Sequence, residues 1–188
     1  MMGLINELTR WLGHTAQMAS ERVIASHVAS NGAAMDIRSG TPNDAVAVVP
    51  MIERICALHR AWDAAKYGFV DDVVPMYRNW LAQRAGDPRS IFIVAAVDDS
   101  PVAFLIGTTE DAAPIFLPPI YGLIRDLWVE DNWRRHHIGQ QILRVAIDRF
   151  RTIGVAQIRI ETATANDTAR RFFTSCGFRP SANEMLIE

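Results

Sequence analysis

The chain has 188 residues, a length typical of one domain, and hydrophobic residues make up 49% of it, which excludes wholesale disorder. Nineteen basic and twenty-one acidic side chains give a net charge of −2, so no general electrostatic attraction to nucleic acid is expected. Cys56 and Cys176 are too few for a disulfide scaffold and favour a reduced, cytoplasmic protein. The longest apolar run, residues 91–97, is far shorter than the roughly 18 residues of a membrane span.

Residues 1–34 are predicted to be an N-terminal extension that precedes the main domain at residues 35–188. An amphipathic helix is indicated there by apolar residues at helical spacing: Leu4, Ile5, Leu8, Trp11 and Leu12. Val23, Ile24 and Val28 extend the same pattern. We expect this helix to pack on the domain or on a second subunit, because its polar face is not basic enough for a membrane surface.

From residue 35 onward, strand and helix patterns alternate. Strands are predicted over residues 35–39, 90–97, 102–108, 121–129 and 157–163, with a last strand after Gly177. The first helix starts at Thr41 and has an apolar face made of Val46, Val49, Ile52, Ile55 and Cys56. Further helices are predicted over residues 72–83, 138–150 and 167–176. This order predicts an α/β fold with a mixed sheet flanked by helices.

Several common catalytic and cofactor patterns are missing from the sequence. The only lysine, Lys66, follows an alanine, so there is no phosphate-binding Gly-Lys-Ser/Thr loop. Gly139 is the only glycine at the strand-to-helix turn, too few for a dinucleotide fingerprint, and no Ser lies between two glycines as in a nucleophile elbow. His136 and His137 are adjacent and lack a second ligand at metal spacing, so no metal site is predicted.

The turn that joins a strand to a helix at residues 129–139 remains as the site of chemistry. Arg134 and Arg135 lie beside the free amides of a helix start, a combination that binds phosphate groups. The alternative is that these arginines and histidines are only a solvated turn.

This turn and a later segment resemble two motifs of the GNAT superfamily of N-acetyltransferases. The family's acetyl-CoA motif is Arg/Gln-x-x-Gly-x-Gly/Ala after a Leu-x-Val strand, and it matches residues 127–129 and 134–139. The second signature, Asn-x-x-Ala-x-x-Phe-Tyr-x-x-x-Gly-Phe, matches residues 166–178. The resemblance covers residues 35–188 and implies a GNAT fold, with direct transfer of acetyl from acetyl-CoA to an amine in a ternary complex.

The resemblance also implies where acetyl-CoA binds. Backbone groups of Leu127, Trp128 and Val129 would pair with the pantetheine arm like an added strand, and one amide there would polarise the thioester carbonyl. The pyrophosphate would lie on the turn and helix start formed by Arg134, Arg135, His136, His137, Ile138, Gly139 and Gln140. Asn166 would hydrogen-bond the pantetheine, with room left beside Ala169, although a helix N-cap is an equally compatible role for Asn166.

Three positions give specific expectations. His137 replaces the first motif glycine, which would cost about 1 kcal/mol if the backbone there has a positive φ. A branched side chain at Gly139 is expected to crowd the approach of the pyrophosphate. Phe173 stands where many relatives have a tyrosine that protonates the leaving thiolate. A thiol pKa near about 8.5 makes this loss tolerable, and water or Tyr121 are alternative donors.

The attacking amine must lose a proton, and two carboxylates on the strand before the turn are the candidate catalytic bases. Alternation places Asp126, Trp128 and Glu130 on one face of that strand. Asp126 is preferred over Glu130 because its sequence context is similar to that of amine-acetylating relatives, and Glu161 on the next strand is a third candidate. Further acidic residues are expected to attract a cationic amine: Asp71, Asp72, Glu110 and Asp111.

The sequence therefore predicts an acetyl-CoA-dependent N-acetyltransferase that acts on a primary amine of a small molecule. The alternatives are a protein N-terminal or lysine acetyltransferase, and a non-catalytic acetyl-CoA-binding sensor or interaction module, which His137 and Phe173 favour. No nucleic acid, membrane or metal is expected, and a homodimer is expected because dimers are common in the family.

Overall fold

The computed structural model describes residues 23–28, 32 and 34–187. Its strands are β1 (Val23–Val28), β2 (Ala34–Ser39), β3 (Ser90–Val97), β4 (Ser100–Asp111), β5 (Ile120–Val129) and β6 (Ile158–Ile160). Its helices are α2 (Pro42–Ala47), α3 (Val49–Trp62), α4 (Val73–Arg84), the short 3₁₀ helix η1 (Asp131–Trp133), α5 (Ile138–Thr152) and α6 (Asp167–Ser175).

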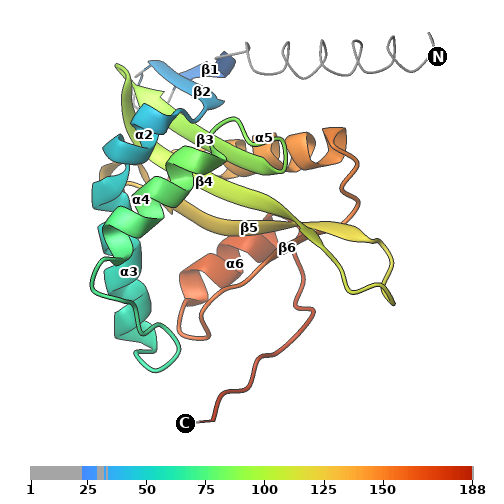
Figure 1. Cartoon of the computed structure of the whole chain (residues 1–188). Helices are drawn as coiled ribbons and strands as arrows, with labels where there is room; N and C mark the ends of the chain where they lie inside the picture. Colours follow the sequence, from blue (N-terminus) through green and yellow to red (C-terminus); the bar gives the residue numbers. More distant parts are fainter. Residues whose placement is uncertain (1–22, 29–31, 33, 188) are drawn as a thin grey trace, which may run out of the picture.

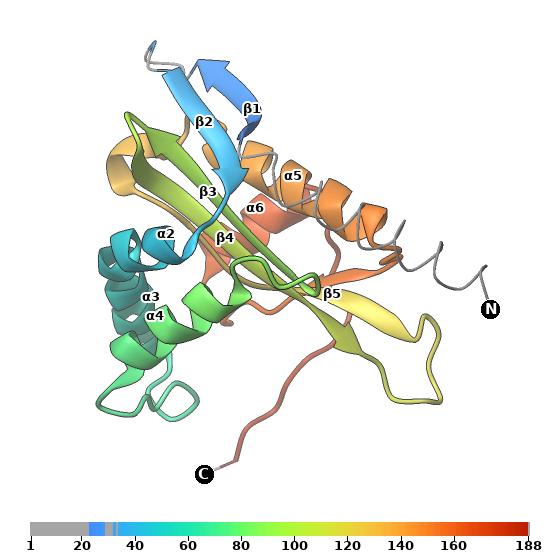
Figure 2. The same ribbon diagram turned by 45° about the horizontal axis from the view of Figure 1, so that its top comes forward.

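The described strands form one mixed sheet in the order β1-β2-β3-β4-β5-β6 (Figures 1 and 2). Neighbouring strands from β1 to β5 are antiparallel, whereas β5 and β6 are parallel. Parallel strands need a long crossover, which here contains α5. The turn between β5 and α5 therefore lies at the carboxyl end of β5.

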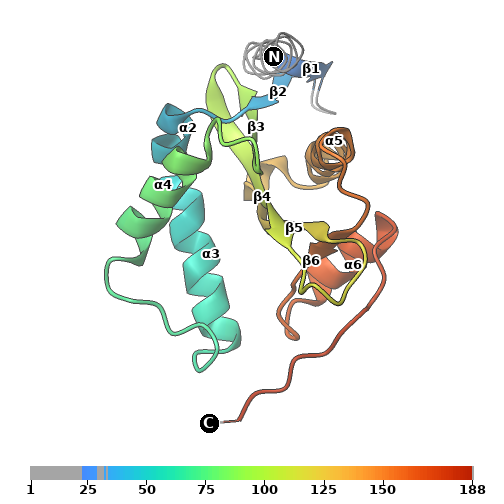
Figure 3. The same cartoon turned by 45° about the vertical axis from the view of Figure 1, so that its right-hand side comes forward.

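Helices cover both faces of the sheet (Figure 3). Helices α2, α3 and α4 pack on one face around Ile52, Leu81 and Phe104, and α5 and α6 pack on the other around Ile142, Phe150 and Phe173. The Phe150 ring lies directly on β4 and β5, because a Cβ at Gly107 or Gly122 would lie 2.8 Å from it.

The start of α2 follows the predicted signal. The Thr41 hydroxyl accepts a hydrogen bond from the Asp44 backbone N–H at 3.3 Å, and Asp44 Oδ2 accepts one from the Thr41 N–H at 2.8 Å. Arg38 of β2 also donates to both Asp44 oxygens, at 2.7 and 2.8 Å. Burial acts to raise the pKa of Asp44, but the hydrogen bonds from Arg38 and Thr41 outweigh it and lower that pKa. This buried network fixes α2 to the sheet.

Three predicted elements need correction. Val23, Ile24 and Val28 do not continue a helix; they belong to strand β1, which pairs with β2. The predicted first helix is two helices, because the chain bends at Val48 and leaves Val46 59% exposed. No strand follows Gly177 within the described residues, and the predicted N-terminal helix over residues 4–12 lies outside them.

Within the described ranges, no helix combines the length and the apolar character that crossing a membrane requires.

Candidate functional site

Strands β5 and β6 pair over only a short stretch. Residues 122–124 of β5 pair with residues 158–160 of β6, and β5 then continues through Val129 with no described strand beside it on that side. The edge of β5 at residues 127–129 therefore has no partner strand among the described residues, although the Val129 carbonyl there accepts a hydrogen bond from Arg134 Nε. An open strand edge is the geometry needed to accept an extended ligand as an added strand.

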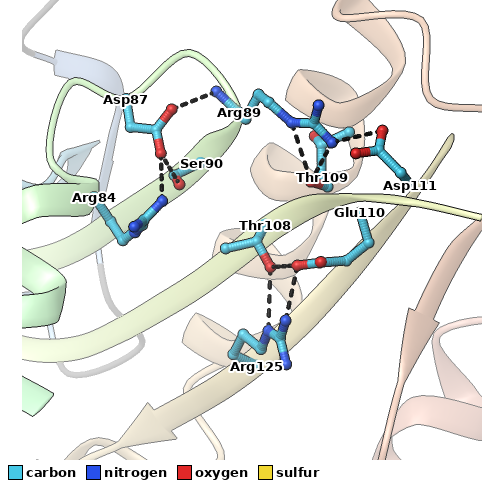
Figure 4. A network of polar contacts seen from close by, with 9 residues as sticks. All are labelled: Arg84, Asp87, Arg89, Ser90, Thr108, Thr109, Glu110, Asp111 and Arg125. Atoms are coloured by element: carbon cyan, nitrogen blue, oxygen red, sulfur yellow. Dashed lines mark hydrogen bonds and ion pairs between the residues drawn. The ribbon is translucent and has the colours of Figure 1, made fainter.

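A bulge at Arg125 determines which way the end of β5 faces. Ile106 of β4 pairs with Asp126 and Gly107 pairs with Ile124, so Arg125 has no partner in the ladder. Its guanidinium is held instead by the Thr108 hydroxyl at 3.1 Å and by Glu110 at 2.7 Å (Figure 4). The bulge is therefore anchored to β4 by polar contacts.

The same network corrects the prediction about acidic residues near the acceptor. Glu110 is paired with Arg125, and Asp111 is paired with Arg89 at 2.9 Å (Figure 4). Neutralised in this way, the two carboxylates contribute little to the attraction of a cationic amine. Asp71 and Asp72 are exposed in the connection that precedes α4.

Past the bulge, Asp126, Trp128 and Glu130 lie on the face of the sheet that carries α3 and α4, as alternation predicts. Trp128 is part of the core on that side, whereas Leu127 and Val129 pack against the core on the α5 side.

Asp126 accepts a hydrogen bond from the hydroxyl of Tyr77, which reaches it from α4. Burial raises the pKa of the Asp126 carboxyl to about 6, although the Tyr77 hydrogen bond and the positive charge of Arg125 act to lower it. The Cys56 thiol of α3 lies close enough for its pKa to be raised by burial and by the Asp126 charge. The pKa of the Asp126 carboxyl thus lies much closer to neutral pH than that of an ordinary aspartate.

Glu130 has a different environment. Its carboxylate is ion-paired with Arg54 of α3 and accepts a hydrogen bond from Trp128 Nε1 at 3.3 Å. It lines a surface depression of about 370 Å³ between the start of β4 and η1. Both of its carboxylate oxygens therefore have a partner, one from α3 and one from β5. Glu161 is exposed just after β6.

The turn between η1 and α5 has two residues in the left-handed region. Arg135 has φ 66° and His137, the N-cap of α5, has φ 62°. His137 occupies the position of the first motif glycine, so the expected conformational cost is present. Its Nδ1 contacts Gln140 Oε1 at 3.0 Å. His136 lies edge-on to Trp133, with ring centroids 6.4 Å apart.

The start of α5 offers hydrogen-bond donors. The first backbone bond of the helix runs from the Gln141 N–H to the His137 carbonyl, so the amides of Ile138, Gly139 and Gln140 have no intrahelical acceptor. Arg135 is exposed beside them. Arg134 instead folds back, donating to the Val129 carbonyl at 3.0 Å and pairing with Asp131 at 2.8 Å. Of the two predicted phosphate arginines, Arg135 is the one whose charge remains available at the turn.

Gly139 lies where α5 approaches α6 and β5 closely. A Cβ there would lie 3.2 Å from the Phe172 ring of α6 and 3.7 Å from Val129. The missing side chain therefore allows α5 to approach α6 and β5, and a larger residue would press on the Phe172 ring. The expected crowding of a pyrophosphate at Gly139 stays a prediction.

The second motif forms the start of α6. Asn166 is its N-cap, with Oδ1 accepting from the Ala169 N–H at 3.0 Å, which leaves the side-chain NH₂ as a donor. Ala169 packs at the edge of the core. Phe173 is 6% exposed and packs edge-on against Phe172 and Phe178. The motif thus has a structural role in capping and packing α6, and Asn166 keeps a free donor.

Tyr121 does not lie near the thioester position that the motifs imply. It precedes Asp126 by five residues on β5, roughly 16 Å along an extended strand. Its ring packs under the Arg159 guanidinium, 3.7 Å from the centroid.

Sequence reasoning missed the contributions of α3 and α4 to this site. Tyr77 and Cys56 surround Asp126, and Arg54 pairs with Glu130. The one available signal was a tyrosine within an apolar helical segment, and nothing local connects it to a residue 49 positions later. As for metals, the described part of the chain contains no cluster of three His, Cys, Asp or Glu side chains able to hold an ion.

Comparisons with known proteins agree with this geometry. A family model described as "Acetyltransferase (GNAT) family" matches residues 55–178, a span that includes β5, the turn, α5 and α6. No curated protein matches the chain.

Solved structures share the fold at low sequence identity. A GCN5-related N-acetyltransferase from Ralstonia eutropha JMP134 has a TM-score of 0.65 at 20% identity, covering 82% of this chain and 98% of that one. A predicted acetyltransferase from Clostridium acetobutylicum, solved with acetyl-CoA, has a TM-score of 0.66 at 13% identity, covering 82% and 96%. The aminoglycoside N-acetyltransferase AAC(6')-Iy, solved with CoA, has a TM-score of 0.60 at 14% identity, covering 87% and 95%. The family model, which matches well over half of the chain, and the shared fold together show that this protein belongs to the GNAT family of acetyltransferases.

Proposed function

We propose that this protein transfers the acetyl group of acetyl-CoA directly to a primary amine of a small molecule, with Asp126 as the general base. The observation that carries the proposal is the environment of the Asp126 carboxyl. Asp126 lies in the part of β5 beyond its pairing with β6, and its pKa of about 6 is close to neutral pH. A base with a pKa near the working pH is mostly ionised there and still accepts a proton well.

The residues of this chain fit acetyl-CoA as the co-substrate. The unpaired edge of Leu127–Val129 would hold the pantetheine arm, the Asn166 amide would donate to it, and the amides at the start of α5 with Arg135 would hold the pyrophosphate. When bound, acetyl-CoA supplies an activated acetyl group as a thioester.

Asp126 would first accept a proton from the amine and later donate it to the leaving thiolate. A primary amine with a pKa near about 10 arrives as a cation, which the Asp126 carboxylate would attract. The amine would release one proton to solvent, and Asp126 would take up the second proton as the neutral amine attacks the acetyl carbon. The departing thiolate then needs a proton, and Phe173 has none to give. A carboxyl of pKa about 6 would return the proton readily to a thiolate whose conjugate acid has a pKa near about 8.5. This return would make the absent tyrosine unnecessary.

The small-molecule acceptor is supported by structural relatives. Two aminoglycoside acetyltransferases are among the solved structures that share this fold: AAC(6')-Iy, seen in two structures at 14% identity, and meta-AAC0020 from a soil metagenomic sample, at 19% identity. A ribosomal-protein-alanine N-acetyltransferase from Brucella melitensis biovar Abortus 2308 shares the fold at 15% identity, so a protein N-terminus is the second acceptor to test.

The experiment is acetyl-CoA consumption, followed as free thiol, across a panel of polyamines, amino-acid-like amines, aminoglycosides and peptides with a free N-terminus or lysine. We expect turnover with a small amine, loss of it in Asp126→Asn, and no change in Asp148→Asn, which removes an exposed carboxylate of α5. Binding of acetyl-CoA without turnover on any amine would overturn the proposal and favour a sensor. Turnover confined to the peptides would assign a protein acceptor.

A further inference from the structure

The contact between Tyr77 and Asp126 joins α4 to the carboxyl end of β5. The two residues are 49 positions apart, and the Tyr77 ring is itself held edge-on against Trp80, with centroids 5.4 Å apart. Tyr77 packs against the core formed by α2, α3, α4 and the sheet, so its hydroxyl is delivered to the carboxyl from a fixed direction.

The direction of this hydrogen bond follows from the two groups. Burial and the adjacent Asp126 carboxyl raise the pKa of Tyr77 well above its usual range, so the phenol keeps its proton. A neutral phenol donates and an ionised carboxylate only accepts, so the bond stabilises the ionised form of Asp126.

The other groups that face Asp126 do not share this role. From α3, Cys56 presents a thiol that remains neutral because burial and the Asp126 charge raise its pKa. From β5 itself, Arg125 is directed to Thr108 and Glu110 of β4 and acts on Asp126 only through its charge. Among the described residues, Tyr77 is the one that donates a hydrogen bond to the Asp126 side chain.

We propose that Tyr77 is a positioning residue for Asp126: its hydroxyl holds Oδ2, fixes the orientation of the carboxyl and leaves Oδ1 to take the proton of the acceptor amine. In that step the neutral amine nitrogen forms the new bond to the acetyl carbon and its proton moves to Oδ1. The carbon–sulfur bond of the thioester then breaks, the CoA thiolate leaves and takes the proton back from Oδ1, and Tyr77 keeps its own proton throughout. This inference rests on the proposed function, since it assigns Tyr77 a part in the same reaction.

A purely structural role for Tyr77 makes a different prediction. If the hydroxyl only fills a buried site, its removal changes stability but not the ionisation of Asp126. If it holds the carboxylate, its removal raises the pKa of Asp126, because the ionised form loses its donor.

The test compares Tyr77→Phe, which removes the hydroxyl but keeps the ring and its packing on Trp80, with Tyr121→Phe, which removes a tyrosine hydroxyl far from Asp126, near the start of β5. The first readout is the titration of the Asp126 carboxyl carbon by ¹³C NMR, assigned by its absence in Asp126→Asn, and it needs no substrate. The second is the pH profile of kcat/KM for the amine found in the panel above, with the KM for acetyl-CoA measured alongside.

We expect the Asp126 midpoint in Tyr77→Phe to rise from about 6 by roughly one pH unit, the energy scale of a hydrogen bond to a charged group. The midpoint of the acid limb of kcat/KM then moves up by the same one pH unit. At pH values below that midpoint kcat/KM falls about tenfold relative to the parent, and the KM for acetyl-CoA is unchanged. Tyr121→Phe matches the parent in both readouts.

An Asp126 midpoint in Tyr77→Phe that coincides with the parent's overturns the inference, even if the parent acetylates amines. A midpoint that moves while the parent acetylates nothing in the panel overturns the proposed function instead and leaves the electrostatic pairing established.

Discussion

Asp126→Asn is expected to make the protein more stable above pH 6 although it removes the proposed base. Burial raises the pKa of this carboxyl from 3.8 to about 6, so the folded state binds its proton more tightly than the unfolded chain does. The resulting stabilisation is complete below pH 3.8 and is lost as pH rises through about 6. At pH 8 the native protein therefore carries a buried charge at a net cost.

The size of this cost follows from the same values. At about 1.4 kcal/mol per pKa unit, a rise from 3.8 to about 6 corresponds to about 3 kcal/mol. The side chain is half-buried, and water screens part of the charge, so we expect a gain of about 1 to 3 kcal/mol for the neutral amide at pH 8. Asparagine keeps the shape of the side chain and an oxygen that accepts from Tyr77.

Urea unfolding of the parent and Asp126→Asn at pH 4 and pH 8 measures this difference directly. We expect nearly equal free energies of unfolding at pH 4 and a more stable variant at pH 8, with Asp148→Asn, on the exposed face of α5, near the parent at both. A variant that is less stable than the parent at pH 8, or a difference that is the same at both pH values, would refute the reasoning. A base retained at a cost in stability is the expected signature of a site selected for activity.

Substitutions at three further sites test the geometry of the fold and turn. Because φ is 62° at His137, the His137→Gly variant should be more stable than His137→Ala by about 1 kcal/mol in thermal unfolding, the reverse of the order inside a helix. A His137→Ala variant at least as stable as His137→Gly would contradict this. Gly139→Val should cost about 1 to 3 kcal/mol, and Phe172→Leu should recover part of it in a double-mutant cycle, whereas additive effects would mean that the two do not collide. Asp44→Ala should cost about 3 to 5 kcal/mol in urea unfolding, because Arg38 loses its partner and α2 its cap, and a loss under about 1 kcal/mol would contradict that account.

Local sequence was sufficient for the parts of the fold that local rules determine. The strand–turn–helix at residues 129–139, the α5 helix and the Thr41 cap all depend on neighbours within a few positions, and each was predicted at its place. Asp126 and Trp128 share a face, as predicted, because the bulge at Arg125 precedes both and leaves the alternation after it intact.

The failures involve partners that are distant in sequence. Val23–Val28 has apolar residues at spacings that suit either a helix or a strand, and pairing with β2 decides for the strand. The close contact of Gly139 is with Phe172, 33 residues later, and the partner of Asp126 lies in α4. Such contacts require the assembled sheet, so no periodicity in the chain encodes them.

The pH dependence of kcat/KM for the acceptor amine, in the parent and in Asp126→Asn, tests the proposed mechanism most directly. Dividing the kcat/KM of the parent by that of Asp126→Asn at each pH cancels the titration of the amine itself. We predict that the ratio is about 100 or more above pH 7 and falls with an acid limb near pH 6, as Asp126 becomes protonated. A ratio near one at every pH would show that another group accepts the proton, and it would contradict the assignment of Asp126 as the base.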